Sequence, residues 1–345
     1  MQTPADRIVA QGGLRRHHAS LAELGADKLP QTQVACVEVR VYNLLRTPAA
    51  LARRGLGGGT AVGAVVALIT DFGTTDGYAG ALKGAVLAVC PAATLVDVTH
   101  ELAPHDVRAA MVALGTCYVS FPAGTVFVCV VDPGVGSARR PIVVRTPDYT
   151  FVGPDNGWVT AVLADRGITV PESGLVTLPI GTPVSVIELD RPEYWRARIS
   201  ATFHGRDVFG PVAGWLASGI DPSLLGSASE QVHVLGTHVP VGVGDGIRGE
   251  VVSIDRFGNL LTNIRLAATE TDAVAGVEIG GRTVPGLFRT YAQLESVGAL
   301  TGSNGCVEIA ARERSAARIL GASIGDQVQV RLHPGRPSTG GDQCQ

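Results

Sequence analysis

Charged and aromatic residues are scarce in this sequence, and the patterns of several large protein classes are absent. Charged residues make up 17% and aromatic residues 5% of the 345 positions, and the formal net charge is −3. A nucleic-acid-binding protein would carry a basic excess, and a disordered chain would be less apolar than the 46% found here. No apolar run is long enough to span a bilayer, and no hydrophobic signal segment opens the chain. The composition predicts a globular protein with no nucleic-acid partner and no membrane association.

Metal-binding and redox motifs are also missing. The six cysteines are scattered without a C-x-x-C pair, and this usage favours a reducing, cytoplasmic environment. His100 and His105 lie five positions apart near Asp97, but a turn at Pro104 separates them. We therefore expect no metal site.

Glycine is abundant, with 44 residues, but no glycine motif fits a nucleotide-binding loop. The run Gly55–Gly59 (G-L-G-G-G) precedes a predicted strand, whereas a dinucleotide loop follows a strand and opens a helix. Asp71-Phe72-Gly73 matches the kinase magnesium triplet, but no H-R-D loop or glycine-rich loop precedes it. These patterns argue against a Rossmann dehydrogenase and a protein kinase.

Predicted strands and helices alternate over the first part of the chain, which is typical of a doubly wound α/β sandwich. We expect strands at 64–70, 95–98, 126–131, 142–145 and 150–152, and helices at about 75–89, 107–119, 158–166 and 208–218. From Arg248 the pattern changes to short alternating runs, which predict a small antiparallel β-barrel. Those runs are 249–254, 260–264, 277–279, 306–310 and 327–332, with one helix at 315–320.

These changes of pattern define the domain organisation that we predict. Residues 1–61, with clustered arginine and histidine and the glycine run, form a poorly ordered extension. The α/β domain covers 62–222, a linker 223–244 and the barrel 245–333. The tail 334–345 is rich in glycine, proline and serine and is expected to be loose.

The strongest chemical signal is the stretch Val126–Arg140, V-F-V-C-V-V-D-P-G-V-G-S-A-R-R. Its six apolar residues predict a strand buried on both faces, which ends at Asp132 in a turn forced by Pro133 and Gly134. Because ligands of open α/β sheets bind outside the carboxyl ends of strands, Asp132 followed by Arg139 marks a candidate site. A purely structural turn with an ion pair explains the stretch equally well.

Further polar residues fall at predicted strand ends and helix starts. In the first domain they are Asp71, Asp76, Asp155, Asn156 and His204, and in the second Asp255, Asn259, Ser303 and Asn304. Each alone is better explained as a helix cap, a turn residue or a structural histidine. Their joint occurrence at loop positions favours a functional site, although spacing alone does not name a reaction.

Six motifs together carry a family resemblance. They are T-D-F-G-T-T-D-G-Y (70–78), V-D-V-T-H (96–100), V-D-P-G-V-G-S-A-R-R (131–140), V-G-P-D-N-G (152–157), T-F-H-G-R-D-V-F-G-P-V-A (202–213) and D-R-F-G-N-L-L-T-N-I (255–264). In this order, over residues 64–332, the chain closely resembles the S-adenosylmethionine (SAM) hydroxide adenosyltransferases, relatives of the SAM-dependent fluorinase and chlorinase. The resemblance implies an enzyme in which water attacks C5′ of the SAM ribose, releasing L-methionine and leaving adenosine. It also implies homotrimers with sites at subunit interfaces and no cofactor, since SAM is the substrate.

The resemblance also implies roles for single residues. Asp132, Arg139 and His204 match the aspartate, arginine and histidine that handle the attacking water. Asp71 matches the carboxylate that grips the ribose hydroxyls. The predicted substrate-binding set is Asp71, Phe203, Asp255, Phe257, Asn259 and Ser303; one departure from the halogenases is Asn304, where they carry an arginine that contacts the methionine carboxylate.

Elementary electrostatics favours hydrolysis over halogenation. The halogenases carry a tyrosine where this chain has Asp132, and a carboxylate repels a halide but accepts a proton of water. We expect Asp132 to take one hydrogen bond from the water and His204 the second, with Arg139 orienting Asp132. Gly205 stands where the fluorinase carries a serine and so removes a donor for a small anion. Two alternatives remain: a SAM-dependent halogenase-like enzyme, and a non-catalytic SAM- or adenosine-binding protein, to which the water-handling trio would be of no use.

Overall fold

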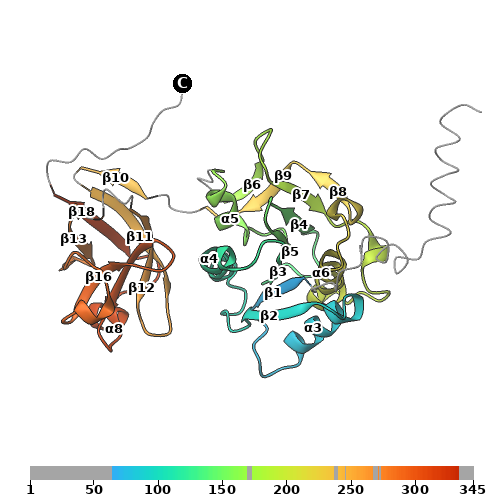
Figure 1. Cartoon of the computed structure of the whole chain (residues 1–345), viewed down its shortest axis with the longest axis horizontal. Coiled ribbons are helices and arrows are strands. Elements are labelled where there is room, and N and C mark those ends of the chain that lie inside the picture. Colours follow the sequence, from blue (N-terminus) through green and yellow to red (C-terminus); the bar gives the residue numbers. More distant parts are fainter. Residues whose placement is uncertain are drawn as a thin grey trace, which may run out of the picture. The chain divides into compact units, whose positions relative to one another are not determined.

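The computed structural model of the chain describes residues 64–168, 173–236, 240–244, 246–266, 271 and 273–333. The predicted extension 1–61 and the tail 334–345 lie outside the described residues. The described part contains a mixed α/β region and an all-β region (Figure 1), each of which has its own hydrophobic core.

A seven-stranded sheet forms the centre of the α/β region, in the order β2-β1-β3-β5-β4-β7-β8. Its parallel strands are β1 (Val65–Thr70), β2 (Thr94–Thr99), β3 (Val126–Val130) and β5 (Thr150–Pro154). Antiparallel pairing adds β4 (Pro141–Arg145), β7 (Ser185–Glu188) and β8 (Ser227–Ser229). A separate two-stranded sheet pairs β6 (Gly174–Thr177) with β9 (Gln231–Val234).

Helices cover both faces of the sheet because its central strands are apolar on both sides. In β1, Val66 and Leu68 pack toward α3 (Tyr78–Val89) and α6 (Gly210–Ala217). The alternate residues Ala67 and Ile69 pack toward α4 (Val107–Cys117) and α5 (Thr160–Asp165). The two cores lie on opposite faces, as the period of two in a strand requires. This arrangement confirms the predicted doubly wound α/β fold.

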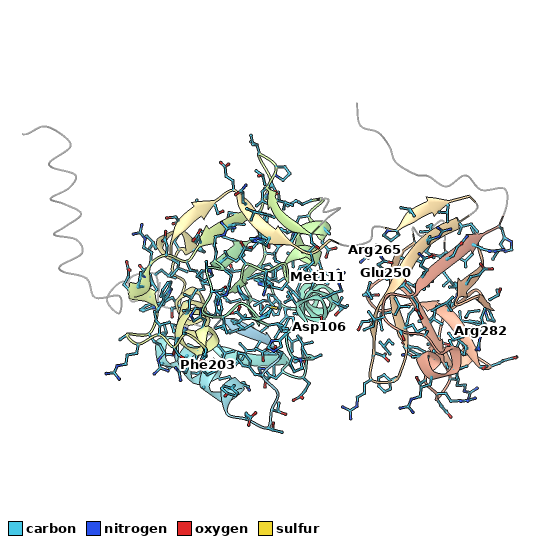
Figure 2. The ribbon with its side chains drawn as sticks, turned by 180° about the vertical axis from the view of Figure 1, so that it is seen from behind. Asp106, Met111, Phe203, Glu250, Arg265 and Arg282 are labelled. Atoms are coloured by element: carbon cyan, nitrogen blue, oxygen red, sulfur yellow. The ribbon has the colours of Figure 1, made fainter. Side chains whose placement is uncertain are left out.

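Several predicted bounds differ from the structure. Helix α3 begins at Tyr78 rather than 75, and α5 at Thr160 rather than 158. Asp106 caps α4 by accepting the N–H of Ala109 (Figure 2), and α4 ends at Cys117 in the 3₁₀ turn Tyr118–Ser120. The predicted helix 208–218 is preceded by a π-helical turn, Gly205–Phe209, that runs into α6. Two further 3₁₀ turns are Pro192–Tyr194 and Pro222–Leu224.

The expected linker 223–244 contains three strands, β8, β9 and β10 (Val241–Val243). Its β8 pairs with β7 and its β9 pairs with β6, so residues 227–234 extend sheets of the α/β region. These strands, S-A-S and Q-V-H-V, have only three and four residues, which is too short for a strand signal, and hydrogen bonding to an existing sheet edge fixes them in place. The remaining predicted domain limits stay predictions.

The all-β region is one curled sheet with the order β14-β13-β18-β11-β12-β17-β16-β15, and β10 also pairs with β11. Its longest strand is β11 (Gly246–Ile254). The others are β10 (Val241–Val243), β12 (Leu260–Arg265), β13 (Val274–Ile279), β14 (Arg282–Val284), β15 (Leu287–Phe288), β16 (Val297–Thr301), β17 (Cys306–Ala311) and β18 (Gln327–Leu332). The order runs from one free edge to another, so the predicted small barrel is a half-barrel (Figure 1).

Two short helical segments lie between strands of the half-barrel. Helix α8 (Ala316–Leu320) is capped by Ser315, whose hydroxyl accepts the N–H of Arg318, and a 3₁₀ turn covers Tyr291–Gln293. Across the described residues of both regions, the helices fall short of the length and apolar character needed to cross a bilayer.

Candidate active site

The strand order places two predicted carboxylates at one point of the sheet. β2 lies on one side of β1 and β3 on the other, so the order reverses between β1 and β3. Asp71 directly follows β1, and Asp132 comes two residues after β3. Ligands of doubly wound sheets bind in the crevice outside the strand ends at such a reversal. The topology therefore favours a functional interpretation of both residues.

Asp132, Arg139 and His204 form one hydrogen-bonded group. Nε of Arg139 lies 2.9 Å from Oδ1 and 3.1 Å from Oδ2 of Asp132, and Nη2 donates to the same Oδ2. Nη2 also lies 2.8 Å from Nδ1 of His204. The pair is nearly buried, since the Arg139 and Asp132 side chains are 10% and 7% exposed. The predicted water-handling trio is thus assembled within the α/β region alone.

The loop that carries this group is shaped by two glycines. A Cβ on Gly134 would lie 3.2 Å from Cγ of Arg139, so the arginine folds back over bare backbone. Gly136 has φ +77°, and a Cβ there would lie 2.4 Å from the carbonyl oxygen of Ala201. The guanidinium also lies 5.2 Å from the ring centroid of the buried Phe209. These contacts hold Arg139 and its loop against the segment 201–209, which carries His204.

The protonation of His204 follows from its partner. An arginine only donates hydrogen bonds, so Nδ1 of His204 accepts from Arg139 and the proton of the neutral ring sits on Nε2. Burial and the Arg139 charge lower the pKa of His204, against the opposing effect of Asp132 and Asp207. The neutral ring therefore presents an Nε2–H donor. This differs from the expected acceptor role, because sequence gives no information on which nitrogen Arg139 uses.

Asp71 is held by an unusual turn. Its Oδ2 accepts the backbone N–H of His105 at 2.8 Å. His105 has φ +69°, and its carbonyl accepts the N–H of Val107 at 3.0 Å, which closes an inverse γ-turn centred on Asp106 (φ −82°, ψ 83°). The positive φ of His105, a non-glycine residue, is a strained backbone conformation, and such strain often occurs at functional sites. The contact of His105 with Asp71 has no signal in the sequence, because residues of almost every type carry a backbone N–H.

Phe203 belongs to a small aromatic cluster next to His204. Its ring makes edge contacts with Phe72 (5.6 Å between centroids) and Tyr78 (5.2 Å). The Arg206 guanidinium lies 5.0 Å from the Phe203 ring centroid and bonds the fully buried Asp207 through two nitrogens. The hydrogen bonds from Arg206, followed by one from the backbone N–H of Ser200, lower the pKa of Asp207. The ion pair between Arg206 and Asp207 and the ring contacts of Phe203 therefore hold the segment around His204 in place.

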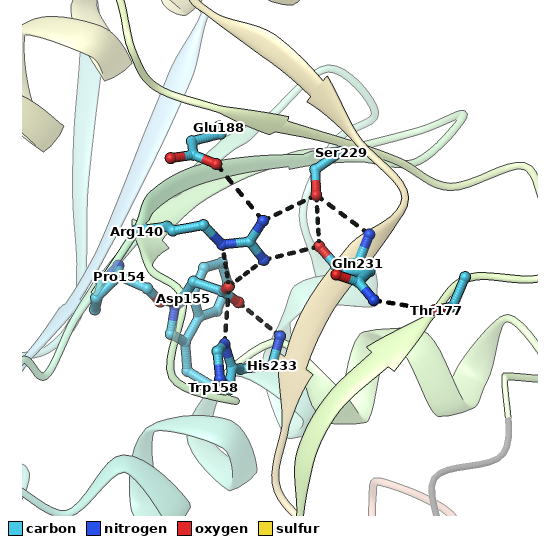
Figure 3. A network of polar contacts seen from close by, with 9 residues as sticks. All are labelled: Arg140, Pro154, Asp155, Trp158, Thr177, Glu188, Ser229, Gln231 and His233. Carbon is cyan, nitrogen blue, oxygen red and sulfur yellow. Dashed lines mark hydrogen bonds and ion pairs between the residues drawn. The ribbon is translucent and has the colours of Figure 1, made fainter. Parts of the chain in front are cut away.

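The neighbouring Arg140 serves the fold rather than the predicted site (Figure 3). Its Nε and Nη2 bond Oδ2 of Asp155 at 3.0 and 2.6 Å, and the Asp155 side chain is fully buried. Asp155 also accepts the N–H of His233 at 2.7 Å, and Arg140 donates to Ser229 at 2.9 Å. This network ties the loop after Arg139 to β8 and β9. Asp155, which the sequence offered as a candidate, is therefore structural.

Asn156 supports the strand end instead. Its Nδ2 donates to the carbonyl of Val131 at 2.9 Å, one residue before Asp132. Asp76 has no comparable place in the assembled group.

Within the described residues there is no cluster of three histidine, cysteine or acidic side chains arranged to hold a metal ion. Buried His100 uses both ring nitrogens, bonding Thr70 at 2.8 Å and Asp97 at 3.0 Å.

In the half-barrel, the D-R-F-G-N motif forms a tight turn at the rim of a cavity of about 910 Å³. Oδ1 of Asp255 accepts the N–H groups of Phe257 and Asn259, and its Oδ2 accepts Nδ2 of Asn259 at 2.9 Å. Gly258 in this turn has φ +85°. Asp255, Phe257 and Asn259 all line the cavity, and Phe257 is 77% exposed. Ser303 is not one of the lining residues.

One polar pair at this cavity went unpredicted. Tyr291, which lines the cavity, donates its hydroxyl to Oε1 of Glu308 at 2.7 Å. Burial, followed by this bond, raises the pKa of Tyr291 to about 12, and burial raises the pKa of Glu308. Glu308 sits in an apolar strand run, C-V-E-I-A, and this break in the pattern was the available signal.

Comparison with known proteins identifies the family. The model of the SAM hydroxide adenosyltransferase N-terminal domain matches residues 66–226, and that of the C-terminal domain matches 249–329. This chain belongs to the SAM hydroxide adenosyltransferase family. Among its members, a Thermus thermophilus protein named (R)-S-adenosyl-L-methionine hydrolase is 38% identical over 77% of this chain and 98% of its own length.

More distant relatives and solved structures agree with this membership in the SAM hydroxide adenosyltransferase family. A protein of Nocardia brasiliensis named fluorinase is 26% identical over 78% of this chain and 97% of its own length. An uncharacterized conserved protein from Thermotoga maritima superposes with a TM-score of 0.68 at 30% identity, covering 77% of this chain and 99% of that one. The family and the fold expected from the motifs are both confirmed.

Proposed function

We propose that this protein is a SAM hydrolase that forms adenosine and L-methionine. The oxygen of water bonds to C5′ of the ribose, the C5′–S bond breaks, and its electron pair stays on sulfur as the methionine thioether. One proton of the attacking water is released. The sulfonium is a cationic leaving group that departs neutral, so the reaction requires no general acid. Relatives named SAM hydrolase at 32–38% identity support this activity.

The observation that carries the proposal is the Asp132–Arg139–His204 group at the reversal of strand order. The carboxylate keeps a lone pair on Oδ1 beyond its bond to Arg139, and this lone pair accepts a proton of water. Nε2–H of His204 donates to the water oxygen. One oxygen lone pair then remains for C5′, which is the orientation that an in-line attack needs.

Asp71 and the half-barrel cavity supply the binding half of the proposal. Asp71 Oδ1 takes no part in the bond to His105 and is assigned to the ribose hydroxyls. Asp255, Phe257 and Asn259 are assigned to the nucleoside and methionine parts, supported by their common cavity. Phe203 and Ser303 are assigned to substrate by the family resemblance alone.

The test is incubation of purified protein with SAM in chloride buffer made with ¹⁸O water, with products separated by mass. Adenosine carrying ¹⁸O and unlabelled methionine would support attack at C5′. Chloro-adenosine would instead show halogenation, and bound but unreacted SAM would show a binding protein. Heat-denatured protein serves as the control for spontaneous decay of SAM.

We further propose that the enzyme is a homotrimer with sites completed by a neighbouring subunit, and that it works without a cofactor in the cytoplasm. The family resemblance supports the trimer, and native mass spectrometry tests it directly. The chemistry of the sulfonium supports cofactor independence, which predicts unchanged turnover after dialysis against EDTA. The four cysteines of the described residues are free thiols, which suits a reducing compartment; cell fractionation tests this location.

A further inference from the structure

The V-D-V-T-H motif (96–100) at the end of β2 contributes no residue to the site described above. β2 lies beside β1 in the sheet (Figure 1), and the register between the two strands shifts by one residue at Val98. Such a shift re-aims the side chains that follow it. Here it brings His100, rather than Thr99, level with Thr70 at the end of β1.

His100 connects the ends of both strands through its imidazole ring, and its side chain is 2% exposed. Nδ1 lies 2.8 Å from Oγ1 of Thr70, and Nε2 lies 3.0 Å from Oδ1 of Asp97. Nζ of Lys83, on α3, donates to Oδ2 of Asp97 at 2.6 Å. Because a carboxylate only accepts, Nε2 of His100 carries a proton, which leaves Nδ1 of the neutral ring to accept the Thr70 hydroxyl. A continuous chain of hydrogen bonds therefore runs from α3 through β2 to the end of β1.

This chain of hydrogen bonds ends on the turn that carries Asp71. Oγ1 of Thr70 accepts the N–H of Phe72 at 3.2 Å, and the carbonyl of His100 accepts the N–H of Gly73 at 2.7 Å. His100 therefore holds the backbone on both sides of Asp71. The backbone of residues 70–73 in turn sets the direction of the second carboxylate oxygen of Asp71, Oδ1.

We propose that His100 is a positioning residue for substrate binding, which acts through Thr70 on the Asp71 carboxylate. The inference rests on the proposed function, in which Oδ1 of Asp71 binds the ribose hydroxyls. Hydrogen bonds depend steeply on distance and angle. A turn that is held on both sides keeps the carboxylate in its binding position before SAM arrives, which lowers the cost of binding. A histidine that only joined two strands would affect stability, whereas His100 should affect ribose binding as well.

The test combines three variants with one matched control. His100→Leu removes both ring nitrogens, and His100→Asn keeps a polar atom at the place of Nδ1 without reaching Asp97. Thr70→Val removes the hydroxyl with little change of shape. The control, Thr146→Val, removes another buried threonine hydroxyl that accepts a backbone N–H, from Tyr149 at 3.1 Å. Because β4 runs antiparallel to β5, the control lies at the other end of the strands from the site.

His100→Leu and Thr70→Val should each weaken adenosine binding by roughly 3- to 10-fold in calorimetry, as expected for the loss of one net hydrogen bond. The KM for SAM should rise by the same factor while kcat stays within about threefold, because the lost interaction is one of binding. His100→Asn should keep adenosine affinity within about twofold of the unmodified protein. Thr146→Val should lower Tm but leave adenosine affinity within about twofold.

The decisive measurement repeats His100→Leu in an Asp71→Ala background. If His100 acts through Asp71, adenosine affinity should then change by less than about twofold, while Tm falls as much as it does with Asp71 present. Should His100→Leu not fold, Thr70→Val takes its place in the cycle.

An equal loss of adenosine affinity in both backgrounds would overturn the proposal, as would full affinity in both His100→Leu and Thr70→Val. Adenosine binding needs no turnover, so these outcomes bear on His100 alone. Absence of adenosine formation by the unmodified enzyme would instead contradict the proposed function.

Discussion

Replacement of Arg139 by lysine should separate catalysis from binding. The guanidinium donates to both oxygens of Asp132 and to Nδ1 of His204, whereas an ammonium is a point donor that replaces one such bond at most. Each charged hydrogen bond lost costs about 1.5–3 kcal/mol, and the estimate that follows counts one of them as a lower bound. At about 1.4 kcal/mol per factor of ten, kcat should fall roughly 10- to 150-fold. Adenosine affinity should change little, because Asp71 and the half-barrel cavity are untouched.

The adjacent arginine provides a matched control. Arg140→Lys loses bonds of the same kind to Asp155 and Ser229, but these belong to the structural network. It should lower Tm by several degrees and leave kcat within about threefold at temperatures where the protein stays folded. Steady-state adenosine formation and calorimetric adenosine binding are the assays. The reasoning is refuted if Arg139→Lys keeps nearly full kcat, or if Arg140→Lys reduces kcat equally.

Five further outcomes are expected. Asp132→Asn should retain adenosine binding and lose at least about 100-fold in turnover, since the water loses its acceptor; equal turnover excludes the role. Asp71→Ala should weaken binding of both SAM and adenosine by calorimetry, and unchanged adenosine affinity would exclude the ribose contact. Because the pKa of His204 is lowered from 6.5, kcat should stay flat down to about pH 6.5 and fall only below it. In the same pH range His204 binds protons more readily in the unfolded than in the folded protein, so it should lower the stability of the fold as pH drops. The control is the dependence of Tm on pH in His204→Gln, which should lack this contribution. Gly136→Ala should lower unfolding stability by more than about 1 kcal/mol in urea melts, because of its left-handed φ and the Ala201 carbonyl.

The central strands were predictable from the sequence, whereas the roles of Asp132, Arg139 and His204 were implied by the family resemblance and stay predictions, although the three side chains are hydrogen-bonded to one another. Buried parallel strands are continuous apolar runs, and the aspartate that ends β3 breaks such a run sharply. The strands β6 to β9 were not predicted, since each is only three or four residues long and its place is fixed by pairing with strands distant in sequence. The strands β14 to β16 of the half-barrel were also missing from the prediction, and each of them has five residues or fewer.

The missed parts of the site share a cause as well. The N–H of His105 binds Asp71 through the backbone, and the choice of Nδ1 on His204 depends on where Arg139 lies in space. Neither leaves a trace in residue type. Likewise, a Cβ at position 205 would lie 2.9 Å from Cζ of Phe72, which is 133 positions away in the sequence.

Residues 227–234 pair with strands of the α/β region, and this pairing determines where the chain can be shortened without exposing strand edges. A fragment ending at residue 222 would leave the edges of β7 and β6 without β8 and β9, and would remove His233 from the buried Asp155 carboxylate. Unpaired strand edges favour aggregation, and an under-bonded buried carboxylate is costly. A fragment that continues through residue 236 keeps both strand pairs and the hydrogen bond from His233 to Asp155.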